Sequence, residues 1–133
     1  MTPELQGIDH IHVFVRDRDR AVRWYREVLG FEPVTGLETW AADGGPLTLG
    51  DAGGHIHLAL FERPAQPNRA TLALRTDAAG LAQWFAHLST QLGAPPTVQD
   101  HALSLSLYFS DPDGNPYEIT TYEHAAARQA LGR

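Results

Sequence analysis

Near its C-terminal end the chain reads Phe109-Ser110-Asp111-Pro112-Asp113-Gly114-Asn115-Pro116-Tyr117-Glu118-Ile119. The central Asp-Pro-Asp-Gly predicts a tight turn between two strands, because proline presets its backbone angle and glycine adopts a conformation that other residues resist. Such a turn fixes where the second strand begins and therefore the direction in which Glu118 points. A carboxylate held on a strand in this way is a candidate metal ligand or acid–base group.

A second informative stretch lies near the N-terminus, where residues 8–15 read Ile-Asp-His-Ile-His-Val-Phe-Val. The alternation predicts a strand with apolar side chains on one face and His10, His12 and Phe14 on the other. A helix is expected next, because apolar residues recur at helical spacing up to Gly30, a typical residue after a helix C-terminus.

The rest of the chain repeats this plan. Strands are predicted at residues 32–35, 38–42, 46–49 and 55–61, and later at 70–76, 97–100, 103–109 and 116–122. A second helix is expected after Asp77, and a third over residues 123–131. Paired positions along the two halves indicate a diverged tandem repeat: Asp17 with Asp77, Trp24-Tyr25 with Trp84-Phe85, and Leu29-Gly30 with Leu92-Gly93.

The repeat predicts an α+β fold of two tandem βαβββ modules. Module one spans about residues 7–62, a linker covers 63–68, and module two spans about 69–122, all within a single domain of 133 residues. Each sheet has one face covered by its helix, so pairing the bare faces predicts a common concave surface for a ligand.

Composition and charge exclude several classes of partner and site. A net charge of −6 argues against a nucleic-acid partner, because no basic stripe is present to neutralise phosphates. The absence of cysteine excludes a disulfide frame and a zinc–thiolate cluster. No apolar stretch approaches a membrane span and the first residues lack a signal-peptide pattern, so we expect a cytoplasmic protein with no membrane partner.

Three polar side chains are predicted to reach the helix-free face from separate strands: His10, His57 and Glu118. Two imidazoles and one carboxylate suit a divalent metal such as Fe, Mn, Ni, Co or Zn, and three protein ligands leave positions open for substrate. Histidines on strands are also often surface groups or ordinary hydrogen-bonding residues, which is the interpretation we favour for His87, His101 and His124.

Three stretches resemble the vicinal oxygen chelate superfamily, which includes glyoxalases, bleomycin and fosfomycin resistance proteins and extradiol dioxygenases. They are residues 9–31, residues 55–60 and residues 108–119. The resemblance implies paired βαβββ modules that form a cup-shaped mixed sheet with the helices on its outer face. It also implies a divalent metal in the cup, a small-molecule substrate and a homodimer.

The resemblance places metal ligands on the first and last strand of each module. The matching positions here are His10, His57, Thr71 and Glu118. Thr71 is a poor ligand where relatives carry histidine, so the expected set is reduced to His10, His57 and Glu118. His12 and His55 are expected to face the cup, and His12 and Glu118 are the candidate acid–base groups.

Two classes of function follow. The first is a metal-dependent enzyme that chelates vicinal oxygens of a small substrate, by dioxygenase or glyoxalase-like lyase or isomerase chemistry. The second is a metal-free binding protein, as in bleomycin resistance, that sequesters a drug or metabolite in an acidic, aromatic groove. Trp40, Phe14, Phe61 and Tyr108 are the predicted lining of that groove.

Overall fold

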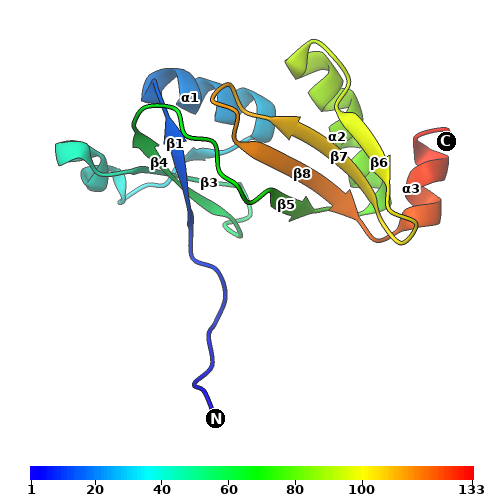
Figure 1. Ribbon diagram of the computed structural model, residues 1–133, viewed down its shortest axis with the longest axis horizontal. Coiled ribbons are helices and arrows are strands. Elements are labelled where there is room, and N and C mark those ends of the chain that lie inside the picture. The colour runs from blue at the N-terminus through cyan, green and yellow to red at the C-terminus, as the bar shows by residue number, and fades with distance from the viewer. The chain divides into compact units, whose positions relative to one another are not determined.

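The computed structural model describes all 133 residues and divides into two compact units, Met1–Ala65 and Gln66–Arg133 (Figure 1). The division falls inside the stretch that the two prolines of residues 63–68 mark as a linker. None of the helices combines the length and the apolar character that crossing a membrane requires.

The N-terminal unit contains one four-stranded sheet with helical segments between its first two strands. Its elements are β1 (Ile11–Val15), α1 (Arg18–Trp24), a π-helical turn η1 (Tyr25–Leu29), β2 (Glu32–Pro33), 3₁₀ turns η2 (Glu38–Gly44), β3 (Leu47–Gly50) and β4 (His57–Glu62). The strand order is β1-β4-β3-β2, with β1 parallel to β4 and the other pairs antiparallel.

The C-terminal unit repeats this order. It contains β5 (Leu72–Arg75), α2 (Ala78–Leu92), β6 (Thr97–Asp100), β7 (Leu105–Ser110), β8 (Pro116–Thr121) and α3 (His124–Ala130). The strand order is β5-β8-β7-β6, again with the first and last strands of the module parallel. Helix α2 packs on β7 and β8, and α3 packs on α2 and β7 (Figure 1).

The caps of the two module helices match. The side chain of Asp17 accepts a hydrogen bond from the Arg20 backbone N–H, and that of Asp77 accepts one from Gly80. At the other ends, Gly30 and Gly93 both adopt the left-handed conformation, with φ of 72° and 73°. The predicted α+β fold with two βαβββ modules is therefore confirmed.

Alternating burial separates the two faces of each sheet. In β1 the side chains of Val13 and Val15 are buried, whereas His12 is exposed. In β8 Tyr117 and Ile119 are buried while Glu118 is partly exposed. Each core lies between its sheet and its helices, and the polar residues singled out from the sequence lie on the opposite face.

The Asp-Pro-Asp-Gly turn is closed by the side chain of Asp111, which is only 5% exposed. Its Oδ1 accepts hydrogen bonds from the backbone N–H groups of Asp113 and Asn115, and its Oδ2 accepts one from the Asn115 side chain. Gly114 adopts a φ of +86°, as the turn requires. This turn sets the start of β8 and hence the position of Glu118.

Three local predictions were wrong. Residues 38–42 form 3₁₀ turns rather than a strand, and the carbonyls of Ala41 and Gly45 accept hydrogen bonds from the Arg18 guanidinium instead of from a neighbouring strand. The first strand begins at Ile11, because its ladder with β4 starts at the pair Ile11–Leu58 and not at the residues before it. His55, the predicted start of a strand, lies in a turn before β4, where the Asp51 carboxylate accepts a hydrogen bond from its backbone N–H.

Candidate functional site

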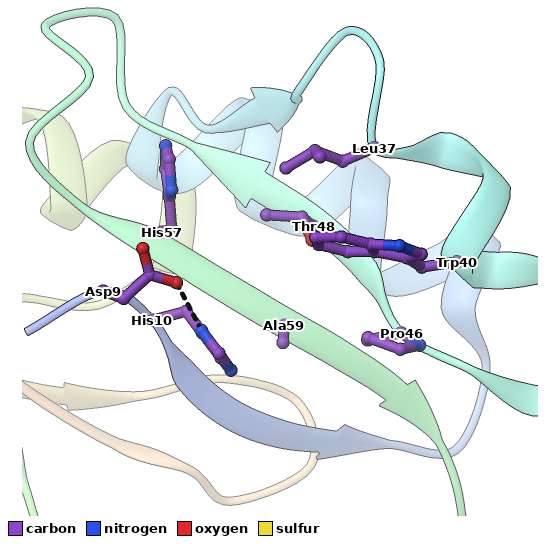
Figure 2. Close-up of a pocket in the computed structure, with 8 residues that line it drawn as sticks. All are labelled: Asp9, His10, Leu37, Trp40, Pro46, Thr48, His57 and Ala59. Carbon is purple, nitrogen blue, oxygen red and sulfur yellow. Dashed lines mark hydrogen bonds and ion pairs between the residues drawn. The ribbon is translucent and has the colours of Figure 1, made fainter.

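The parallel pairing of β1 with β4 brings two of the predicted ligands together. Ile11 is opposite Leu58, so His10, which immediately precedes β1, and His57, the first residue of β4, lie at the same end of this strand pair. Both side chains line a cavity of about 410 Å³ on the helix-free side of the N-terminal unit (Figure 2). The cavity is lined by Asp9, His10, Leu37, Trp40, Pro46, Thr48, His57 and Ala59.

His10 is oriented by its neighbour. Its Nδ1 lies 2.7 Å from Oδ2 of Asp9, and its Nε2 lies 3.1 Å from Nε2 of His12. When Nδ1–H donates to the carboxylate, a neutral His10 presents an unprotonated Nε2, which is the form that binds a metal. The short contact with His12 then requires that His12 supply the proton between the two rings.

His12 is held in a row of rings along the same face. Its ring stacks on His10 with centroids 5.1 Å apart and tilts against Phe61 at 4.8 Å. Phe61 also meets Phe14 edge to face at 6.0 Å. This row keeps the His12 imidazole beside His10, at a distance that suits proton exchange between the two rings.

Glu118 is positioned in the C-terminal unit by a second set of contacts. The hydroxyl of Ser106 donates a 2.7 Å hydrogen bond to Oε2 of Glu118 and lies 2.8 Å from the hydroxyl oxygen of Thr120. The Ser106 hydroxyl carries one proton, which serves the two short contacts to Glu118 and Thr120, and the Thr120 hydroxyl donates to the Leu105 carbonyl at 3.4 Å. Ser106 is fully buried, so this donor is protected from competing water.

Tyr108 lies directly across from Glu118 in the pairing of β7 with β8. Burial raises the pKa of the Tyr108 phenol, and the Glu118 charge and hydrogen bond raise this pKa further. The phenol oxygen is 2.9 Å from Nε2 of His101. Sequence reasoning missed Ser106 and placed Tyr108 only as groove lining, although both alternate with the buried Leu105 and Leu107.

The pairing of β4 with β1 and of β8 with β5 shows which residues of the two modules occupy equivalent positions. Leu58 pairs with the first residue of β1, and Tyr117 pairs with the first residue of β5. The residue of β4 that corresponds to Glu118 is therefore Ala59, and His57 lies two residues earlier on the same face. The equivalence of His10 with Thr71 holds, because each immediately precedes the first strand of its module.

The ligand set itself stays a prediction. His10 and His57 share a cavity in the N-terminal unit, and Glu118 belongs to the helix-free face of the C-terminal unit. The structure contains no group of three His, Cys, Asp or Glu side chains arranged to hold a metal ion. The donor chemistry nevertheless fits one, because the Asp9–His10 and Ser106–Glu118 contacts are the kind that orient metal ligands.

Residues 7–119 match the family model of the Glyoxalase/Bleomycin resistance protein/Dioxygenase superfamily. With most of its length matched, and with the paired βαβββ modules described above, the chain belongs to this superfamily.

Solved structures support the same fold. An integron cassette protein from the mobile metagenome of V. cholerae is 29% identical, with a TM-score of 0.63 over 92% of this chain and 99% of that one. A virulence protein of Salmonella typhimurium is 27% identical, with a TM-score of 0.63 over 90% and 99%. The fosfomycin resistance protein FosX of Listeria monocytogenes, complexed with Mn(II) and sulfate, is 14% identical, with a TM-score of 0.67 over 96% and 99%.

Proposed function

We propose that the protein is a divalent-metal-dependent enzyme that acts on a small substrate with vicinal oxygens. His10, His57 and Glu118 would hold the metal, which supplies Lewis-acid stabilisation of negative charge on bound substrate oxygens. The observation that carries this proposal is that one ring nitrogen of His10 and one oxygen of Glu118 are each engaged by a dedicated partner, Asp9 and Ser106.

The residues around these ligands have defined tasks in the proposed enzyme. Asp9 keeps the His10 ring in the tautomer whose Nε2 can bind a cation, and Ser106 restrains the Glu118 carboxylate. His12, within hydrogen-bond distance of His10, is the proposed general base or acid for a substrate bound in the cavity. Superfamily membership and the Mn(II)-bound FosX structure support a divalent metal of the Mn, Fe, Co, Ni or Zn group.

Two reaction types remain in competition. Dioxygenation uses a redox-active metal, and a two-histidine, one-carboxylate set is typical of non-haem iron sites. Glyoxalase-like isomerisation, or lyase chemistry of the same kind, needs a base such as His12 beside the bound substrate. Metal-loaded protein should be assayed with catechols, with hemithioacetals and, because FosX is a structural neighbour, with fosfomycin. Turnover of one class assigns the reaction.

The first test of the enzyme proposal is metal content. Protein purified without chelator should contain about one transition-metal ion per chain, as three protein ligands with open positions imply. His10→Ala should abolish this content. His55→Ala is the matched control, because His55 lies in the turn before β4 and only its backbone joins that turn. Equal metal content in all three proteins would overturn the proposal.

A metal-free binding protein is the second candidate, and the exposed indole of Trp40 at the cavity favours it. This alternative predicts ligand binding that is unchanged after exhaustive chelation. For either function we propose a cytoplasmic homodimer, as expected from the sequence and the resemblance, and its mass in solution can be measured by light scattering.

A further inference from the structure

The cavity of the N-terminal unit has two chemically different walls. Asp9, His10 and His57 form a polar wall, and Leu37, Trp40 and Pro46 form an apolar wall. Thr48 and Ala59, which face each other across β3 and β4, are small and buried and form the floor between the walls (Figure 2). The function proposed above uses only the polar wall.

Trp40 is held in place although its side chain is exposed. The residue as a whole is 55% exposed, yet its loop is tied to the unit by two arginines. The Arg18 guanidinium donates to the carbonyls of Ala41 at 3.3 Å and Gly45 at 2.9 Å, and Arg63 donates to Gly44 at 2.9 Å. The indole is therefore presented to the cavity by an anchored backbone.

Two backbone positions in this loop have conformations or contacts that few residue types permit. Asp43 has a φ of +57°, which is uncommon for a residue with a side chain. A Cβ at Gly45 would collide with the Trp40 carbonyl, so only glycine permits the observed path. Strained and tightly fitted positions of this kind are concentrated where a loop presents a ligand-binding group.

The charges around the cavity restrict what it can accept. No Arg or Lys lines it, and Asp9 is its one carboxylate. In the metal-free cavity a phosphonate or phosphate would find no cation to replace the water it gives up. The volume of about 410 Å³ lies at the small end of the usual range for ligand cavities.

We propose that Trp40, with Leu37 and Pro46, binds a flat, uncharged ring of the ligand, while the oxygen substituents of that ring face Asp9, His10 and His57. The indole stacks on the ring and sets the preference for planar over puckered or anionic ligands. The placement of the oxygens rests on the function proposed above. The stacking of the ring does not.

Three probes separate these features. Catechol has a flat ring with vicinal oxygens, trans-cyclohexane-1,2-diol has vicinal oxygens on a puckered ring, and methylphosphonate is a small anion. Their affinities should be measured by calorimetry on chelator-treated and on Mn(II)-loaded protein. We expect catechol to bind up to about tenfold more tightly than the puckered diol in both states, as the stacking of two rings implies, and more tightly than methylphosphonate in the chelator-treated protein.

The variants assign this preference to Trp40. Trp40→Leu should lose about tenfold in catechol affinity, and Trp40→Phe should retain most of it because the flat ring remains. Tyr122→Leu removes an exposed ring of the C-terminal unit and should change nothing. Should Trp40→Leu not fold, Trp40→Phe and the probe ranking still test the proposal.

Two results would overturn the role of Trp40: equal catechol binding by Trp40→Leu and the native chain, or, in the chelator-treated protein, tighter binding of methylphosphonate than of catechol. The enzyme proposal fails separately. A chain that binds catechol through Trp40 but takes up no Mn(II) keeps the ring site and loses the metal function. A chain that takes up Mn(II) without any preference for the flat ring keeps the metal function and loses the ring site.

Discussion

The hydroxyl of Ser106 donates a 2.7 Å hydrogen bond to Glu118 from a position with no solvent exposure. The serine is on β7 and the glutamate on β8, so the contact depends on the antiparallel register of these two strands. A buried neutral donor restrains a carboxylate while leaving its negative charge uncompensated. This is the environment expected of a carboxylate that binds a cation.

Ser106→Ala should weaken metal binding while leaving the fold intact. Loss of an oriented partner of a ligand typically costs about tenfold to a hundredfold in metal affinity, and loss of one hydrogen bond costs about 1 kcal/mol in stability. Mn(II) titration calorimetry measures the first effect and urea unfolding the second. Ser89→Ala is the control, because Ser89 makes a comparable hydrogen bond within α2. Equal losses of affinity in both variants would contradict the role of Ser106.

Asp9→Ala should weaken metal binding through His10. The Asp9 side chain is 88% exposed, so its effect is screened by salt and should be larger at low ionic strength. The measurement is Mn(II) affinity at two salt concentrations, and the exposed Asp19→Ala is the charge-matched control. A change that is the same in both variants would indicate net charge rather than orientation of the His10 ring.

Asp111→Ala should destabilise the C-terminal unit strongly. It removes a buried carboxylate that accepts three hydrogen bonds and leaves backbone N–H groups of the turn without their acceptor. We expect a loss of about 3 kcal/mol in the free energy of unfolding. Asp111→Asn keeps one acceptor oxygen and should lose less. Urea titrations followed by circular dichroism compare the three proteins, and similar stabilities would refute the role of Asp111.

The arrangement of faces could be predicted from the sequence, because period-two alternation is a local property of each strand. His10, His12 and Glu118 lie on the helix-free faces for this reason. The turn at Gly114 and the caps at Asp17, Asp77, Gly30 and Gly93 were equally accessible, since each depends on one residue type and its neighbours.

Contacts between distant residues could not be predicted. Residues 38–42 have the composition of a strand, but Arg18, more than twenty positions away, satisfies the carbonyls of the loop. The same limitation explains why the sequence matched His57, and not Ala59 two residues later, to Glu118. The register of β4 against β1 depends on strand pairing rather than on composition. His55 was misplaced because Asp51 closes a turn before β4.

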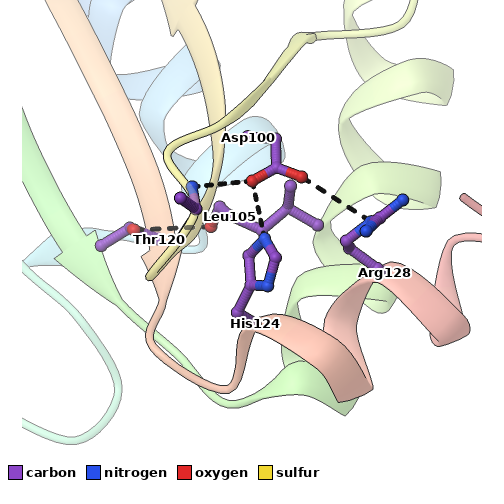
Figure 3. Close-up of polar contacts among 6 residues, drawn as sticks. Asp100, Leu105, Thr120, His124 and Arg128 are labelled. Atoms are coloured by element: carbon purple, nitrogen blue, oxygen red, sulfur yellow. Dashed lines mark hydrogen bonds and ion pairs between the residues drawn. The ribbon is translucent and has the colours of Figure 1, made fainter.

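The contact of Asp100 with α3 predicts a pH-dependent stability. Two hydrogen bonds to the Asp100 carboxylate hold its pKa below the ordinary value of 3.8 (Figure 3). The larger effect comes from the Ala102 backbone N–H and the smaller one from the His124 ring. The contribution of Asp100 to stability is therefore complete above that ordinary value and is lost as the pH falls through the lower pKa of the folded state. Asp100→Asn should reduce the melting temperature at about pH 7, and this difference should shrink as the pH falls below 3.8 and through the lower pKa of the folded state. A difference that persists unchanged in acid would contradict the assignment.

The proposed function depends on the binding of one metal ion by His10, His57 and Glu118. The most direct measurement is titration of chelator-treated protein with Co(II), read by visible absorption and calorimetry, for the native chain and for Glu118→Ala. We predict about one ion per chain for the native protein and loss of binding in Glu118→Ala, because a carboxylate is one of only three protein ligands. Binding that survives unchanged in Glu118→Ala would assign the ion to the histidines of the N-terminal unit alone, and absence of binding in the native chain would refute a metal site altogether.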